Sequence, residues 1–201
     1  LAWMQAAAAR LKGALGGSVM VQEQGRYFNR LYWVRPDGTY EKYDKKHLFR
    51  FGGEPEQYTS GGGRLIVELK GWRICPLICY DLRFPVWARN RYHENRFEYD
   101  VLLYTANWPA RRTHHWESLM LARAIENLSY CVGLNRVGCD GNGLDHAGHS
   151  RVCDPTGKIY QPLESGAEGL IQTTLSAQGL LDWRSKFNTG PDWDPFTLEG
   201  V

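Results

Sequence analysis

Short apolar runs alternate with amphipathic segments along this chain. Four runs have the length and bulk of buried strands, at residues 65–69, 72–79, 100–106 and 130–135. Apolar residues recur at helical spacing in four other segments, at residues 3–15, 85–90, 113–127 and 177–187. Helices interleaved with buried strands favour an α/β fold in which helices cover a mixed sheet.

Turn residues add antiparallel strands to this pattern. Gly25 separates two strand-like segments, and Pro36-Asp37-Gly38 predicts a turn because proline fixes φ and glycine permits positive φ. Extended segments are expected at residues 18–24, 28–35, 39–43, 150–154, 158–160 and 170–174. No repeat or linker interrupts the chain, so we expect a single domain over residues 1–201.

Composition narrows the class of protein. The net charge is +2, from 24 basic and 22 acidic residues, which gives no reason to expect a nucleic-acid or membrane-surface partner. No apolar run has the length of a transmembrane helix, and no secretory signal is visible. The five cysteines are an odd number without the spacing of a disulfide framework, so we expect a reducing cytoplasm.

Three side chains could carry chemistry. Cys79 ends an apolar strand, where α/β enzymes place catalytic groups, although a lone cysteine is more often a small buried hydrophobe. Lys45 follows a predicted strand, and Glu54 lies in the polar loop after it. A lysine can activate a thiol and stabilise an oxyanion, and a carboxylate can take the thiol proton or orient the lysine. Taken alone, the lysine and the glutamate also fit solvated surface positions.

Five segments, in order, resemble motifs of the nitrilase, or carbon–nitrogen hydrolase, superfamily. Residues 43–49 (Tyr-Asp-Lys-Lys-His-Leu-Phe) resemble its lysine motif, and residues 79–85 (Cys-Tyr-Asp-Leu-Arg-Phe-Pro) resemble its nucleophile motif. The other three segments are residues 106–109, 123–127 and 148–155. The resemblance runs from about residue 3 to residue 187 and is strongest to the bacterial omega-amidase branch.

The resemblance implies a role for each residue in a Glu–Lys–Cys active site. Cys79 matches the nucleophile and Lys45 matches the lysine. Glu54 matches a second glutamate of the family, with Glu56 as a rival one alignment gap away. The backbone N–H of Tyr80 would help to hold the oxyanion. No metal or cofactor is implied.

The resemblance also implies a four-layer αββα sandwich that forms homodimers. The family's first glutamate, its general base, lies upstream of the hairpin at residues 18–35, and nothing here matches it. Glu23 lies in the wrong place, on a strand of that hairpin. We therefore expect this carbon–nitrogen hydrolase domain to be N-terminally incomplete, without its first βαβ portion.

The implied reaction is that of a thiol amidohydrolase. It would convert short ω-amides of 2-oxo dicarboxylic acids, such as 2-oxoglutaramate or 2-oxosuccinamate, to carboxylate and ammonia through a cysteine thioester. Such a substrate needs a cation for its distal carboxylate. We expect Arg83 to supply it, with Phe84 and Trp108 as pocket walls, and Arg111 and Arg112 as weaker candidates.

Alternatives exist for several of these residues. Arg83 could instead form a structural ion pair with Asp81 or Glu126. A Cys–His hydrolase would pair Cys79 with one of two adjacent histidines, His114 or His115. A zinc site would draw on four residues, Cys75, Cys79, His146 and His149, although no second matched cysteine pair is present.

Two alternatives concern the whole protein. Nitrilases, aliphatic amidases and carbamoylases share the same triad, so the motifs alone do not separate them from an omega-amidase. A non-catalytic nitrilase-like protein that binds a partner or metabolite is the remaining alternative.

Overall fold

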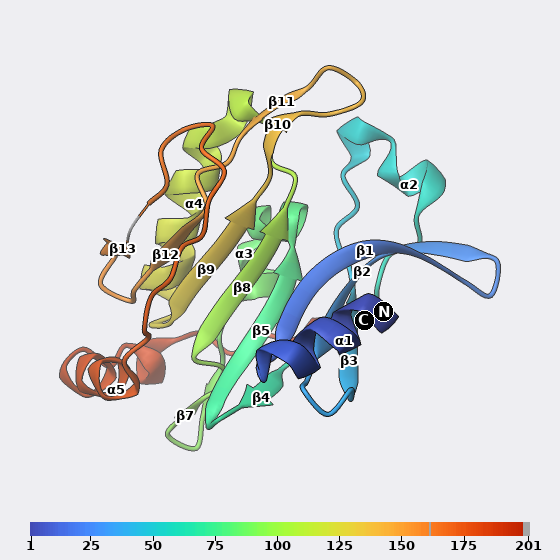
Figure 1. Ribbon diagram of the computed structural model, residues 1–201. Helices are drawn as coiled ribbons and strands as arrows, with labels where there is room; N and C mark the ends of the chain where they lie inside the picture. The colour runs from blue at the N-terminus through green and yellow to red at the C-terminus, as the bar shows by residue number, and fades with distance from the viewer. Residues whose placement is uncertain (161, 199–201) are drawn as a thin grey trace.

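The computed structural model describes residues 1–160 and 162–198, and a six-stranded mixed sheet lies at its centre (Figure 1). The strand order is β13-β12-β9-β8-β5-β4. The inner strands β5 (Trp72–Ile78), β8 (Val101–Ala106) and β9 (Tyr130–Asn135) are parallel. The outer strands pair antiparallel, namely β4 (Val67–Leu69), β12 (Arg151–Cys153) and β13 (Ile159–Tyr160). The predicted mixed sheet is confirmed.

An antiparallel sheet of three strands packs on one face of the central sheet. It consists of β1 (Leu15–Glu23), β2 (Arg26–Val34) and β3 (Tyr40–Asp44). Because side chains alternate along β2, Tyr32 and Val34 pack against α1 (Ala2–Leu11), while Trp33 packs against Ile74 of the central sheet.

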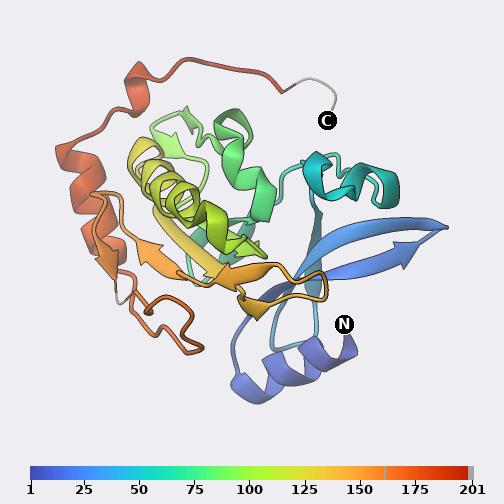
Figure 2. The same cartoon turned by 90° about the horizontal axis from the view of Figure 1, so that it is seen from above.

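The other face of the central sheet is covered by α4 (Thr113–Glu126) and the short helix α3 (Pro85–Ala88). Trp116, Met120 and Ala124 recur every four residues and form the buried stripe of α4. Figure 2 shows α1 and α4 on opposite sides of the two sheets. The layers therefore follow the αββα order that the family resemblance implies.

Smaller elements complete the described chain. They are α2 (Glu54–Gln57), α5 (Ala177–Lys186), the hairpin of β6 (Tyr92–His93) and β7 (Arg96–Phe97), and the hairpin of β10 (Val137–Cys139) and β11 (Asp145–Ala147). Four 3-10 helices are η1 (Arg50–Gly52), η2 (Cys79–Arg83), η3 (Ala110–Arg112) and η4 (Gly190–Asp192). None of the helices within the described residues is long and apolar enough to cross a membrane.

The helix expected over residues 3–15 is wrong at its C-terminal end. It stops at Leu11, and Lys12 takes a left-handed φ of 50° as its cap. Leu15 instead pairs with Val34 in the three-stranded sheet, and Gly16 lies against the ring of Trp33. Strand pairing therefore outweighs the helical pattern in these residues.

The strand expected at residues 170–174 is also wrong. These residues carry no strand and pair with no other strand among the described residues. Leu170 is 84% exposed, and the alternate residues Ile171 and Thr173 are only half-buried. An alternating pattern forms a strand only where a ladder partner and a buried face are both available.

Candidate active site

A cavity of about 600 Å³ opens at the carboxyl ends of the three parallel strands. The register aligns these ends, because Ile78 pairs with Thr105, which in turn pairs with Leu134. All three residues line the cavity, as do Lys45 and Cys79. The edge formed by carboxyl ends is where open α/β sheets bind ligands. Figure 1 shows α2 and the β10–β11 hairpin beyond this edge.

Cys79 lies where the chain leaves the central sheet. Strand β5 ends at Ile78, and Cys79 begins η2 with a φ of 44°. This left-handed conformation is uncommon for a residue other than glycine. The turn leaves Cys79 half-buried and exposes it to the cavity.

The surroundings of Cys79 keep its thiol protonated at neutral pH. Burial raises the pKa of the Cys79 thiol, while the positive charge of Lys45 and the backbone amide of Asn107 lower it. The negative charges of Glu54 and Asp81 also raise the pKa of the Cys79 thiol. A nucleophilic Cys79 therefore needs a base to take its proton.

Lys45 and Glu54 form a close ion pair in the cavity. The Nζ atom of Lys45, whose side chain is 2% exposed, lies 2.8 Å from Oε1 and 2.6 Å from Oε2 of Glu54. The Glu54 carboxylate also accepts the backbone N–H of Phe49 at 2.6 Å. Glu56 is exposed and forms no ion pair with Lys45 in the described part of the chain. The structure thus pairs the lysine with Glu54.

Backbone contacts fix the position of Lys45. Its N–H donates to the carbonyl of Asn29 at 2.9 Å, and its carbonyl accepts the N–H of Gly61 at 2.9 Å. A Cβ atom at Gly61 would meet the Asp44 carbonyl oxygen at 2.0 Å. Only glycine allows this close approach of the two backbones.

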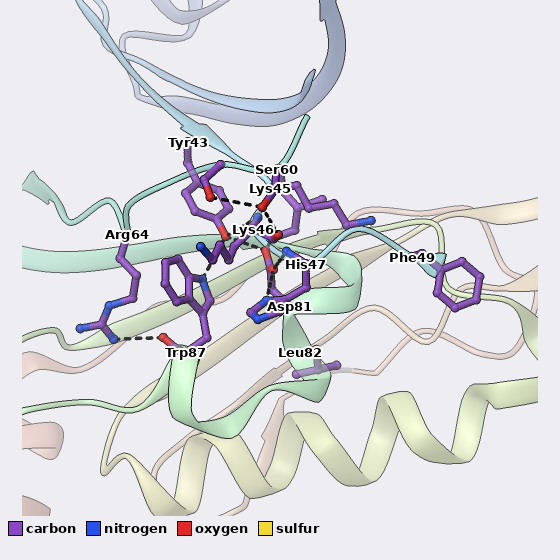
Figure 3. Close-up of polar contacts among 12 residues, drawn as sticks. Tyr43, Lys45, Lys46, His47, Phe49, Ser60, Arg64, Asp81, Leu82 and Trp87 are labelled. Atoms are coloured by element: carbon purple, nitrogen blue, oxygen red, sulfur yellow. Dashed lines mark hydrogen bonds and ion pairs between the residues drawn. The ribbon is translucent and has the colours of Figure 1, made fainter. Parts of the chain in front are cut away.

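Asp81 joins the lysine segment to the cysteine turn (Figure 3). Its side chain is fully buried and accepts the Tyr43 hydroxyl at 2.7 Å and the backbone N–H of Ile78 at 3.0 Å. Its other oxygen accepts the backbone N–H of His47 at 3.0 Å and lies 2.8 Å from the His47 ring. One carboxylate therefore connects both motifs that carry the candidate catalytic residues.

Arg83 and Trp108 lie in the cavity as expected. The Arg83 guanidinium stacks on the Trp108 ring, with Cζ 4.6 Å from the ring centroid. Arg83 also lies 3.0 Å from Nδ1 of His115. The alternative ion pair with Asp81 or Glu126 is wrong, because neither carboxylate forms an ion pair with Arg83.

Two expected substrate contacts are corrected by the structure. Phe84 does not line the cavity, because its ring stacks on His47 at 3.7 Å and faces a separate hollow. Phe84 therefore packs behind the cysteine turn. Arg111 is exposed and lies outside the cavity lining, whereas Arg112 is part of it.

The alternative chemistries find no support in the described part of the chain. Neither His114 nor His115 lines the cavity with Cys79. Cys75 is buried on β5 and Cys79 lies on the turn after it, so the two thiols do not share one strand. No group of residues within 1–160 and 162–198 has the composition and geometry to hold a metal ion.

Two residues of the site, His146 and Asp81, have surroundings that the sequence does not predict. His146 is buried in the cavity wall, and its Nδ1 atom has no hydrogen-bond partner among the described residues. From the sequence, Asp81 is expected only as a possible partner of Arg83. Its adjacency to a buried strand end was the available signal, since a carboxylate buried there must be hydrogen-bonded.

The carbon–nitrogen hydrolase family model matches residues 1–185. The chain is 47% identical over 196 residues to Omega-amidase YafV of Escherichia coli K12, covering 98% of this chain and 75% of that protein. It is 36% identical over 168 residues to 2-oxoglutaramate amidase of Bacillus subtilis, covering 82% of this chain and 62% of that protein.

Solved structures agree with this grouping. The structure of XC1258 from Xanthomonas campestris, described as a CN-hydrolase superfamily protein with an arsenic adduct in its active site, matches with a TM-score of 0.95 and 47% identity. The match covers 98% of this chain and 75% of that one. Nit3 of Saccharomyces cerevisiae, at 23% identity and a TM-score of 0.81 over 93% of this chain and 68% of that one, shares the fold.

Proposed function

Because this chain belongs to the carbon–nitrogen hydrolase family, we propose that Cys79 is its nucleophile and that Lys45 and Glu54 assist it. The observation that supports this assignment is the buried Lys45–Glu54 ion pair in the same cavity as Cys79. A cation in that position lowers the pKa of the thiol and favours the thiolate.

The relatives define the reaction class. With relatives named omega-amidase and 2-oxoglutaramate amidase at 36–47% identity, the protein is an amide-hydrolysing enzyme of the omega-amidase type. Its proposed substrates are short 2-oxo dicarboxylic acid ω-amides such as 2-oxoglutaramate. Arg83, stacked on Trp108, is the proposed partner of the substrate carboxylate.

Hydrolysis proceeds in two halves through Cys79. The thiol proton passes to a carboxylate base, the role that the family resemblance gives to its first glutamate. The Cys79 sulfur then bonds to the amide carbon. The charge that develops on the amide oxygen is stabilised by Lys45 and by the backbone N–H of Tyr80, which lies at the start of η2. The C–N bond then breaks, and ammonia leaves with the transferred proton. Water hydrolyses the resulting thioester to a carboxylate and returns the Cys79 thiol.

We propose that the enzyme works in the cytoplasm as a homodimer. The described structure has all five cysteines as free thiols, which suits a reducing compartment. The homodimer is proposed from the family resemblance, which implies pairing of copies across the helical layers. Light scattering on the purified protein should give twice the 23.0 kDa mass of one chain; a monomer would contradict the homodimer.

The assignment of the nucleophile is tested by ammonia release from 2-oxoglutaramate. Cys79→Ala should lower kcat by about 1,000-fold or more, because no other group replaces the covalent step. Cys139→Ala is the matched control, since Cys139 is exposed and lies outside the cavity lining. Turnover of a nitrile without release from any ω-amide would refute the substrate class, and an active Cys79→Ala enzyme would refute the nucleophile.

A further inference from the structure

The cavity around Cys79 is lined by more positive than negative side chains. The cationic residues of its lining are Lys45, Arg83, Arg112 and Arg136, and the carboxylates are Glu54 and Asp140. Glu54 is bound by Lys45, and Asp140 accepts the backbone amides of Asn142 and Leu144. The cavity therefore has the charge expected for an anionic ligand.

Arg112 is the least neutralised of these cations. Within the described residues its guanidinium forms no ion pair, and its one ring contact is with Phe49, whose centroid is 5.3 Å from Cζ. Burial lowers the pKa of Arg112, and its positively charged neighbours Arg111 and Arg83 lower it further. A half-buried cation without a carboxylate partner is stabilised when an anion binds beside it.

Arg83 and Arg112 both contact the indole ring of Trp108. The Arg83 guanidinium stacks on the indole ring, and the indole N–H donates to the Arg112 carbonyl at 2.8 Å. Nη2 of Arg83 lies 3.0 Å from Nδ1 of His115, and Arg83 forms no ion pair with a carboxylate among the described residues. Arg83 and Arg112, neither of which forms an ion pair with a carboxylate among the described residues, thus line one cavity together with the nucleophile.

We infer that Arg112 binds the 2-oxo acid head of the substrate together with Arg83. This inference rests on the proposed function. An ω-amide of a 2-oxo dicarboxylic acid carries a carboxylate and an adjacent keto oxygen at the end opposite the scissile amide. One guanidinium can donate two parallel hydrogen bonds to the carboxylate, and the other can donate to the keto oxygen and to the remaining carboxylate lone pairs. Arg112 is therefore a specificity-determining residue.

The kinetic test uses Arg112→Met, with the neighbouring Arg111→Met as the matched control. Arg112→Met should raise KM for 2-oxoglutaramate about 10- to 100-fold and change kcat less than about threefold, the effect of one charge-assisted hydrogen bond to bound substrate. Arg112→Lys should give an intermediate KM, because lysine keeps the positive charge but lacks the planar guanidinium that donates two parallel hydrogen bonds. Arg111→Met should behave as the wild type.

A second measurement separates substrate recognition from an effect on the thiol. Iodoacetamide is uncharged, so its rate of reaction with Cys79 should change less than about threefold in Arg112→Met. Binding of 2-oxoglutarate to the Cys79→Ala protein, measured by calorimetry, should weaken about 10-fold or more when Arg112→Met is added.

An unchanged KM and an unchanged 2-oxoglutarate affinity in Arg112→Met would overturn the inference. So would equal losses of turnover and of iodoacetamide reactivity, because Arg112 would then act on Cys79. These outcomes leave the proposed function intact provided that the wild type releases ammonia and Cys79→Ala does not. A wild type that hydrolyses no ω-amide would overturn both.

Discussion

At the residue scale, the backbone of Cys79 is held in a conformation that its own side chain does not favour. A left-handed φ at a residue other than glycine costs about 1–3 kcal/mol and persists only where its surroundings impose it. The carboxylate of Asp81 supplies part of that constraint by accepting the N–H of Ile78 at 3.0 Å. The end of an apolar run predicted where the thiol would lie, but it did not predict this side-chain hydrogen bond, which fixes the geometry of the turn.

The raised pKa of Cys79 predicts how its reactivity depends on pH. Below the folded pKa the thiolate fraction rises about tenfold per pH unit, so the iodoacetamide rate should keep rising beyond the ordinary thiol pKa of 9.0. Lys45→Met should raise the Cys79 pKa further and slow the reaction at pH 8, since the lysine charge lowers that pKa. Peptide mass spectrometry can follow Cys79 alone.

The control for this experiment is Lys42→Met, which removes an exposed lysine that pairs with Glu23 away from the cavity. A rate for Cys79 that levels off between pH 6 and pH 7 would contradict the expected pKa, as would equal behaviour of the two lysine variants.

At the element scale, the active site depends on the contact between two segments that are distant in the chain. Tyr43 and Asp81 are 38 residues apart in sequence and share a 2.7 Å hydrogen bond. The segment after β3 carries Lys45, and η2 carries Cys79 at its start. Both motifs could be recognised from the sequence, but nothing in the sequence showed that Asp81 joins them.

Asp81→Asn should therefore affect both stability and catalysis. An amide nitrogen facing the Ile78 N–H leaves that donor unpaired, which predicts a loss of about 1–3 kcal/mol in the free energy of unfolding. We expect kcat/KM to fall by about tenfold or more, because the lysine segment and the cysteine turn lose their shared anchor. Urea unfolding and ammonia release measure the two effects.

Asp37→Asn is the comparison for this variant, since Asp37 also accepts nearby donors but lies in an exposed turn away from the cavity. A destabilised Asp81→Asn enzyme with normal kcat and KM below its unfolding transition would show that Asp81 only supports the fold.

At the scale of the whole molecule, the separation between α4 and the central sheet sets the position of the cavity wall. Gly133 on β9 lies so close to α4 that a Cβ atom would be 2.6 Å from both Met120 and Trp116. Trp116 in turn contacts Trp108, with ring centroids 5.7 Å apart. Direct packing contacts therefore connect α4 and the central sheet to Trp108 in the cavity wall.

Gly133→Ala should force α4 away from the sheet and lower the free energy of unfolding by about 1–3 kcal/mol, as overpacking of a filled core does. Adding Met120→Ala should recover part of that loss, so the double variant should be less destabilised than the sum of the single variants. Gly62→Ala is the matched control, because open space surrounds Gly62. Additive losses in urea unfolding would refute the proposed contact.

The sequence by itself determined the buried strands, the long helix α4 and the motifs that carry Cys79 and Lys45. These features are local, because apolar periodicity and strand ends are visible within a few residues. The tertiary structure alone decided the end of α1 and the absence of a strand at residues 170–174. It paired Lys45 with Glu54, which the motif match favours over Glu56. It also moved Phe84 out of the cavity and placed Arg112 in it. Each of these outcomes depends on a partner distant in sequence or on a side-chain direction, and neither is encoded in the local pattern.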